Sequence, residues 1–419
     1  MTTASRRNAP DMSAIKQDQL KSTVSDLAYF GGDTTFDEPL HVGRPNIGNR
    51  QDFEKRLADI LDRHWLTNGG RYVTDFEKRI ADIVGVEHCV AMCNATVALE
   101  IAIRALGLSG EVIVPSFTFI ATAHALKWQG ITPVFCDIDR STYNIDPALV
   151  EQLITPRTTG LLPVHVFGRA CDVEALQEIA TRRGLKLLFD SAHAFGCSHG
   201  DGMIGGFGNA EVFSFHATKF INSMEGGAVV TNDADLAARI RLMKNFGFSN
   251  YDQTDYIGTN GKMNEVSAAF GFTNLESMQD FIDINYRNYK QYAAELANID
   301  GLSLITYDTE SKCNYQYIIL EVEEKKTRVT RDQLVELLHA EKVLARRYFY
   351  PGCHSMEPYR TDDPNAGSRL PITEQVAARV VALPTGTAVD SAQISAICEV
   401  VRFIVANGSE VNERFSAMS

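Results

Sequence analysis

The 419-residue chain lacks the features that mark several specialised classes of protein. It has no apolar run approaching the roughly 18 residues of a membrane helix, so we expect no membrane span. It has no run of lysine and arginine, and its net charge of −13 repels phosphate backbones, so we expect no nucleic-acid partner. Its first residues carry two arginines with no apolar stretch behind them. We therefore expect no secretory signal and a cytoplasmic location.

The cysteine pattern excludes two further classes. The eight cysteines form no CxxC motif, and the only close pair, Cys89 and Cys93, has no histidine nearby at metal-ligand spacing. Most of the eight lie inside apolar segments, where reduced and buried thiols are the ordinary state. We expect neither a disulfide framework nor a metal site.

The sequence that is present has the balance of an ordinary globular protein, with 45% hydrophobic and 22% charged residues. Its length predicts two to three units of about 150 residues each. Within 87–235, short strands rich in Val, Ile, Leu and Phe alternate with helices, which indicates an α/β fold with a parallel sheet covered on both faces. The expected strands are 88–94, 111–116, 132–139, 158–168, 185–190, 211–217 and 227–233.

The ends of the chain differ from this central region. Residues 1–45 are polar and irregular, which predicts a loosely packed N-terminal arm. After residue 235 the pattern becomes mostly helical, and near the end a strand at 316–323 is followed by helices at 332–342 and 392–408. We predict an arm (1–45), a large α/β domain (46–285) and a small α+β domain (286–419).

Ligands bind at the carboxyl ends of strands in open α/β sheets, so the residues that follow each strand matter most. Asn94, Ala95, Thr96 and Val97 open a helix after the first strand. Its free amides and the Thr96 hydroxyl could hold an anion, although this motif alone favours a plain N-cap. Phe119 offers an aromatic face at the next strand end, where a core position is the alternative.

A carboxylate, a serine and a lysine follow the later strands. Asp190 ends a buried strand, where a carboxylate is costly unless it meets a cation or donors, so a helix cap and a ligand partner are both open. Ser214 and Lys219 follow in SFHATK, ahead of a glycine pair. Desolvation lowers a lysine pKa enough for covalent chemistry, although most lysines are surface charges. Together these groups match what pyridoxal phosphate (PLP) requires, in the chain order of fold-type I PLP enzymes.

The chain resembles the DegT/DnrJ/EryC1/StrS family of sugar aminotransferases from about residue 40 to 410. The strongest stretches are VPSFTFIATAHAL, FDSAHAFG, VFSFHATKFINSMEGGAVVTND and GTNGKMNEVSAAFG. A closer likeness to the family's 4-aminotransferases is carried by VGRPNIGNR, HWLTNGG, KNFGFS and VLARRYFYPGCHSMEPY. The resemblance implies a fold-type I aminotransferase with PLP as its cofactor.

The resemblance also implies three catalytic roles. Lys219 matches the lysine that holds the cofactor covalently and later moves the proton. Asp190 matches the acid that keeps the pyridine nitrogen protonated, and His193 stands where the family has His or Gln beside the ring oxygen. Dehydratases of the family replace the lysine by histidine, so Lys219 favours transamination.

Five further residues match cofactor contacts of the family. Phe119 matches an aromatic residue that stacks on the ring, and Thr96, Val97 and Ser214 match the phosphate cup. Asn260 matches an asparagine that reaches the same phosphate from the neighbouring subunit. The resemblance therefore implies a homodimer with shared active sites.

The function implied is transfer of an amino group from L-glutamate to a nucleotide-linked keto sugar. The overall likeness favours TDP-4-keto-6-deoxy-D-glucose as acceptor, giving TDP-4-amino-4,6-dideoxy-D-glucose. Three alternatives stay open: amination at C-3 of a TDP-3-keto-6-deoxyhexose, a PLP-dependent sugar dehydratase, and a non-catalytic regulator. Lys219 disfavours the dehydratase, and the intact set of cofactor residues disfavours the regulator.

The diphosphate of such a substrate needs cations in a chain of net charge −13. The nearest candidates are Arg346 and Arg347, and a turn with solvated arginines is the equal alternative. The other residues that we expect near the sugar or base are Thr67, Asn68, Tyr350 and His354.

Overall fold

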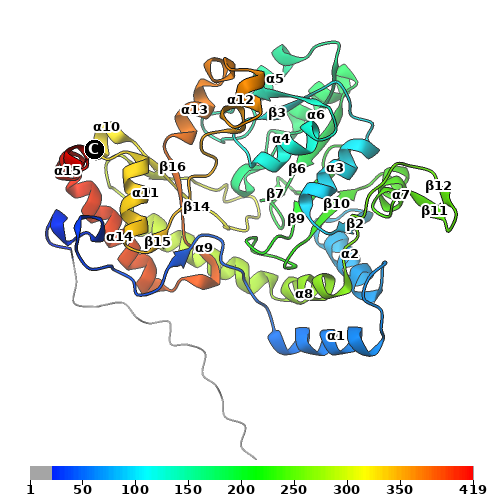
Figure 1. The fold of residues 1–419 in the computed structure, drawn as a ribbon, viewed down its shortest axis with the longest axis horizontal. Coiled ribbons are helices and arrows are strands. Elements are labelled where there is room, and N and C mark those ends of the chain that lie inside the picture. Colours follow the sequence, from blue (N-terminus) through cyan, green and yellow to red (C-terminus); the bar gives the residue numbers. More distant parts are fainter. Residues whose placement is uncertain (1–20, 419) are drawn as a thin grey trace, which may run out of the picture.

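The computed structural model describes residues 21–418 and is built around a seven-stranded sheet. In Figure 1 this sheet lies in the right-hand half of the molecule and a smaller domain lies to its left. All seven strands expected from the sequence are present. In sheet order they are β2 (His88–Met92), β10 (Gly227–Thr231), β9 (Ala210–Ser214), β6 (Lys186–Asp190), β5 (Thr158–Leu161), β3 (Glu111–Pro115) and β4 (Thr132–Cys136).

The sheet is mostly parallel, as expected, with one exception. Strands β4, β3, β5, β6 and β9 pair in parallel, whereas β10 runs antiparallel to both β9 and β2. No helix separates β9 from β10, and a parallel pair normally needs a helical crossover. The short connection therefore reverses β10.

Helices bury both faces of the sheet, because alternate side chains of each strand point to opposite sides. On β9, Val212 packs into one hydrophobic core and Phe213 into another. The helices that cover the sheet are α2 (Arg71–Val84), α3 (Ala95–Ala105), α4 (Ile120–Lys127), α6 (Val173–Arg183), α7 (Ala234–Met243) and α8 (Glu265–Glu276). The site edge of the sheet thus rests on a packed, two-sided core.

The smaller domain is an antiparallel three-stranded sheet under helices. Its strands in sheet order are β13 (Leu302–Leu304), β14 (Ile318–Val322) and β16 (Val380–Leu383), and its helices include α11 (Arg331–Ala340), α14 (Ser391–Ala406) and α15 (Gly408–Met418). Strands β13 and β16 and helix α15 were not anticipated from the sequence. The boundary expected at 285/286 falls inside one continuous helix, α9 (Met278–Glu295).

The described part of the N-terminal arm packs tightly, contrary to expectation. Val24, Leu27 and Phe36 are buried in the core of the smaller domain, and β1 (Leu40–His41) pairs in parallel with β15 (Val343–Leu344). Within residues 21–45, Leu40 is buried in the same core and Tyr29 and Phe30 pack against it, whereas Val42 packs against a different cluster. The first 20 residues of the expected arm lie outside the described part of the chain.

The remaining elements lie at the periphery. Helix α1 (Arg50–Asp62) and the hairpin of β11 (Phe248–Asn250) and β12 (Gln253–Thr254) extend outward from the large domain (Figure 1). The other short elements are α5 (Pro147–Val150), α10 (Glu324–Thr327), α12 (Tyr359–Asp362), α13 (Pro371–Ala377), β7 (Ser198–His199) and β8 (Gly202–Met203).

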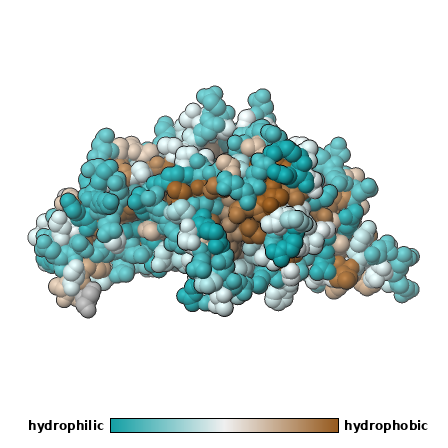
Figure 2. Space-filling view, turned by 90° about the horizontal axis from the view of Figure 1, so that it is seen from above, coloured by the Kyte–Doolittle hydropathy of each residue, from teal (hydrophilic) through white to brown (hydrophobic). Residues whose placement is uncertain are grey.

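The polarity of the surface and the burial of the cysteines are those expected from the amino-acid composition. Figure 2 shows one face that is largely hydrophilic, with hydrophobic residues in separate patches. All eight cysteines lie within the described residues, none of them forms a disulfide there, and all but Cys93 are buried. Within residues 21–418, no helix has the length and apolar character needed to span a membrane, and no three His, Cys, Asp or Glu side chains group as a metal site would require.

Candidate active site

The candidate site forms where β6 and β9 end side by side. Asp190 is the last residue of β6 and Ser214 the last of β9, and Asp190 pairs with Val212 in the parallel register. His193 and Lys219 lie in the loops that follow these two strands. The sheet topology thus brings together four of the residues predicted from the sequence.

The amine of Lys219 lies against a tyrosine that the sequence analysis did not select. Its Nζ is 3.2 Å from the hydroxyl of Tyr317, which directly precedes β14 of the smaller domain. Burial disfavours the charged ammonium form and lowers the pKa of Lys219 to about 8. The negative charge of Asp190 acts in the opposite direction. The amine therefore loses its proton more readily than an ordinary lysine.

Asp190 is a buried carboxylate with two hydrogen-bond donors. The Thr122 hydroxyl lies 2.8 Å from Oδ2, and the Ala192 amide donates to Oδ1 at 3.1 Å. Burial raises the pKa of Asp190, while these two donors and the charge of Lys219 act in the opposite direction. A protonated ring nitrogen would add the cationic partner that a buried carboxylate requires.

His193 is held as a neutral hydrogen-bond donor. Its Nδ1 accepts from the backbone amide of Phe167 at 3.2 Å, so in the neutral ring Nε2 carries the hydrogen. Burial lowers the pKa of His193 well below its usual value, and the charge of Lys219 lowers it further. The ring lies parallel to that of Phe349, with centroids 5.5 Å apart. The Nε2–H group suits a ligand oxygen.

The N-terminus of α3 lies close to the end of β9, where the sequence predicts the phosphate cup. Gly227 pairs with Ser214, and a Cβ on Gly227 would lie 2.5 Å from the Ala95 nitrogen, so only glycine lets α3 start this close to the sheet. Asn94 caps α3 by accepting the Val97 amide at 2.8 Å, so that amide already has a partner. The amides of Ala95 and Thr96 belong to the first turn, which has no intrahelical acceptor.

Phe119 completes the arrangement as an exposed aromatic ring. It is the N-cap residue of α4 and is 58% exposed. Thr122, the donor to Asp190, lies one helical turn further along α4. The buried carboxylate, the amine, the helix-terminus cup and the open ring fit the pyridine nitrogen, the aldehyde, the phosphate and the ring face of pyridoxal phosphate.

Asn260 lies in the segment that follows β12 and is exposed. Its backbone bridges Asn245, and the carbonyl of the next residue, Gly261, accepts the Cys93 amide at 2.9 Å. This segment thus borders the β2 end of its own sheet. The role expected for Asn260 in a partner subunit stays a prediction.

The four substrate candidates after β15 have very different surroundings. Arg346 is exposed, and its backbone pairs with Ala382 of β16. Arg347 forms an ion pair with Asp332 at 3.0 Å and lies over the ring of Tyr350 at 5.2 Å. The Arg346 side chain forms no hydrogen bond or ion pair with any described residue. Arg346 is therefore more available than Arg347 to bind an anion.

His354 is held by protein groups on both ring nitrogens. Nδ1 lies 2.6 Å from the Ser116 hydroxyl, and Nε2 lies 2.6 Å from Glu374. The residue is buried, so this geometry gives it a structural role and leaves no nitrogen for a sugar or base. Thr67 and Asn68 lie on the exposed loop between α1 and α2, and their substrate role stays a prediction.

Sequence reasoning missed Tyr317, Thr122 and Phe349. Tyr317 and Phe349 come from segments distant in sequence, and only the docking of the smaller domain brings them to Lys219 and His193. Thr122 had a usable signal, because it follows Phe119 by one helical turn on the same helix.

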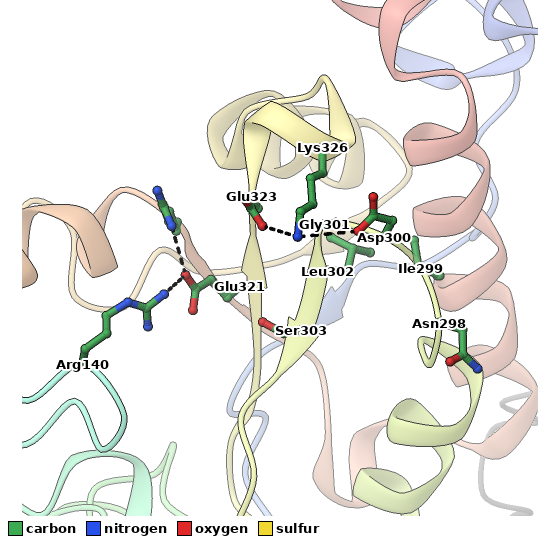
Figure 3. Close-up of a pocket in the computed structure, with 11 residues that line it drawn as sticks. Arg140, Asn298, Ile299, Asp300, Gly301, Leu302, Ser303, Glu321, Glu323 and Lys326 are labelled. Carbon is green, nitrogen blue, oxygen red and sulfur yellow. Dashed lines mark hydrogen bonds and ion pairs between the residues drawn. The ribbon is translucent and has the colours of Figure 1, made fainter.

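A cavity of about 650 Å³ lies elsewhere, between the smaller domain and the loop after β4. Figure 3 shows that its charges pair with one another: Arg140 with Glu321, and Lys326 with Glu323 at 2.9 Å and with Asp300 at 3.7 Å. Its charges are thus already matched within the protein, and it contains none of the predicted site residues.

The chain matches a known protein family along most of its length. The family model of the DegT/DnrJ/EryC1/StrS aminotransferase family matches residues 48–402. The chain belongs to this family. The DesI structure determined in the presence of its TDP-sugar product is 48% identical, with a TM-score of 0.90, and the match covers 94% of this chain and all of that one. The structure of DesV from S. venezuelae is 31% identical, with a TM-score of 0.79 and coverage of 85% and 95%.

Several relatives of the aminotransferase are named for dTDP- or GDP-linked amino sugars. The dTDP-4-amino-4,6-dideoxy-D-glucose transaminase of Shigella dysenteriae is 36% identical over 88% of this chain and 100% of its own length. The GDP-perosamine synthase of Caulobacter vibrioides is 34% identical, with coverage of 85% and 96%. The expected family, the fold-type I architecture and PLP dependence are therefore confirmed.

Proposed function

We propose that the aminotransferase transfers the amino group of L-glutamate to TDP-4-keto-6-deoxy-D-glucose, forming TDP-4-amino-4,6-dideoxy-D-glucose. The acceptor is supported by the likeness to DesI and to the Shigella dysenteriae transaminase. The observation that carries transamination is the lysine amine of lowered pKa beside a buried carboxylate at the end of the sheet.

The chain's own residues have distinct tasks in this reaction. Bound pyridoxal phosphate supplies an electron sink that stabilises negative charge on the carbon losing its proton. Lys219 moves that proton at its Nζ atom, and a general base so placed contributes a factor of about 10² to 10⁴. With the cofactor bound, Asp190 would keep the ring nitrogen protonated, and the His193 Nε2–H group would donate a hydrogen bond to the ring oxygen.

Three rival functions differ from this reaction in chemistry, and only the first of them uses the same residues. Amination at C-3 would need an identical cofactor site, so only the position of the new amine separates it from C-4 amination. A dehydratase is disfavoured because Lys219 occupies the position where the family's dehydratases have histidine. A non-catalytic regulator would have no need of the partnered set of Asp190, His193 and Lys219.

The working unit that we propose is a cytoplasmic homodimer with shared sites. Support comes from the large apolar side chains exposed near α1, namely Ile47, Leu61, Trp65 and Leu66, which are each more than half exposed. In a dimer these side chains would be buried, and the exposed Asn260 could reach the phosphate of the partner. The same contact would bring the loop of Thr67 and Asn68 to the partner's sugar.

The test follows both half-reactions. Purified protein loaded with pyridoxal phosphate should show a visible absorption band that disappears on addition of L-glutamate. Adding TDP-4-keto-6-deoxy-D-glucose should restore the band, and NMR of the product should place the amine on C-4. A band that glutamate does not change contradicts the donor. An amine on C-3, or a deoxygenated product, contradicts the acceptor chemistry.

A further inference from the structure

A second carboxylate, Glu211, is completely buried behind the cofactor residues. It lies in the middle of β9 with no exposed surface and pairs with Phe189 of β6. An ionised carboxylate in such a place costs several kcal/mol unless hydrogen bonds compensate it. None of the catalytic tasks described above uses this residue.

Donors from three segments surround the two oxygens of Glu211. Oε1 accepts the amides of Gly205 at 2.7 Å and Phe207 at 2.8 Å. Oε2 accepts the hydroxyl of Ser191 and lies 3.6 Å from Nε2 of His165. Burial raises the pKa of the Cys171 thiol, and the negative charge of Glu211 raises it further. The carboxylate therefore ties together three segments that are separate in the sequence.

His165 directs its unused nitrogen toward this carboxylate. Its Nδ1 accepts the Cys171 amide at 2.9 Å, so in the neutral ring Nε2 carries the hydrogen. The ring is fully buried and stacks on Phe189 with centroids 4.7 Å apart. Its Nε2 has no hydrogen-bond partner within residues 21–418, and the Oε2 atom of Glu211 lies 3.6 Å from it, just beyond hydrogen-bond distance.

The turn that Glu211 holds is the one that carries the catalytic side chains. Ser191 lies between Asp190 and His193, its amide donates to the Val212 carbonyl, and its own carbonyl accepts the Ala194 amide. The Ser191 hydroxyl is the side-chain link from this turn to β9. Rotation of the turn about β6 would displace the Asp190 carboxylate and the His193 imidazole together.

We propose that Glu211, through Ser191 and with His165 behind it, is a positioning residue that fixes the 190–193 turn in the orientation required for cofactor binding. It acts on the cofactor only through Asp190 and His193. This proposal rests on the pyridoxal-phosphate site and is independent of the identity of the sugar.

The test compares three variants by cofactor binding and spectroscopy. Glu211→Gln keeps the side-chain volume but places an amide group where Ser191 and His165 need an acceptor, and Ser191→Ala removes the hydroxyl alone. We expect the affinity of the apoenzyme for pyridoxal phosphate to fall about tenfold in Glu211→Gln and less in Ser191→Ala, because hydrogen bonds to charged groups are the stronger ones. Visible circular dichroism of the bound cofactor should change in both, since it reports ring orientation.

Glu341→Gln is the matched control. Glu341 is also fully buried and accepts backbone amides, from Ala28 and Thr35, but it lies in the smaller domain. It should leave cofactor affinity and dichroism unchanged even where thermal stability falls.

Three outcomes would overturn the proposal. The first is a Ser191→Ala variant with the cofactor affinity and dichroism of the wild type. If Glu211→Gln fails to fold, the result from Ser191→Ala is sufficient to test the proposal. An equal loss of affinity in Glu341→Gln would show a general stability effect. A wild-type protein that binds no pyridoxal phosphate would contradict the cofactor site itself, and this proposal with it.

Discussion

The cofactor residues and the candidate sugar-nucleotide residues differ sharply in how the protein holds them. Asp190 and His193 are buried and Lys219 is partly so, and each has a hydrogen-bond partner from another element. The candidates Thr67 and Arg346 are exposed. The three residues proposed for the reaction chemistry therefore lie in packed structure, whereas these two residues proposed to bind the nucleotide sugar lie on the surface.

The physical reason is the different demand of the two tasks. Shifting a pKa requires desolvation and fixed neighbours, which only the interior provides. Recognising a charged diphosphate needs cations that solvent reaches until the substrate arrives. We expect the largest effect when one of the buried catalytic side chains is removed.

Lys219→Ala should abolish covalent attachment of the cofactor and lower turnover by at least about 10² to 10⁴-fold, because the proton-transfer base is lost. Visible absorption and an assay of amino-sugar product measure the two effects. Normal turnover in this variant would contradict the assignment of Lys219.

Arg346→Ala tests the exposed set. We expect the KM for the sugar nucleotide to rise about tenfold and that for L-glutamate to change little, because an arginine–phosphate hydrogen bond is charge-assisted. Arg347→Ala is the control, since Asp332 and Tyr350 already engage Arg347. Equal effects of Arg346→Ala on both substrates would argue against a phosphate contact.

The third prediction concerns the pH dependence of cofactor loading. The Lys219 amine attacks only when neutral, so the loading rate of apoenzyme should rise with pH through its pKa of about 8 and level off above it. At pH 7 the rate should be about tenfold below that plateau, since one unit below the pKa about a tenth of the amine is neutral. Stopped-flow absorbance measures it. A midpoint near that of a free lysine would show that burial does not activate the amine.

Local sequence patterns predicted most of the large domain. Its seven strands are short, mostly apolar runs bounded by polar or glycine-containing segments. Strands β2, β3 and β10 are almost fully buried, as such runs require, whereas β4 at the edge of the sheet is only partly buried. The elements of the smaller domain were harder to predict from the sequence. Strand β13 (Leu302–Leu304) is only three residues long, and the apolar residues of the arm are too sparse to show a period. Both are stabilised by partners distant in sequence.

The residues of the candidate site also fall into those that the sequence predicted and those that it did not. Asp190, Ser214 and Lys219 follow strands of one parallel sheet, so topology alone predicts that they meet. Tyr317 and Phe349 could not be placed by that rule, because they belong to the smaller domain and its connections. His354 was misjudged because Ser116 and Glu374, which hold its ring, come from separate parts of the chain.

The sequence by itself determined the class of fold, the family and the cofactor, since these depend on strand order and on residue types at strand ends. The tertiary structure decided which nitrogen of His193 carries the proton, how readily Lys219 loses its own, and which of two adjacent arginines is free. These properties depend on desolvation and on contacts across the fold, and neighbours in sequence do not encode either.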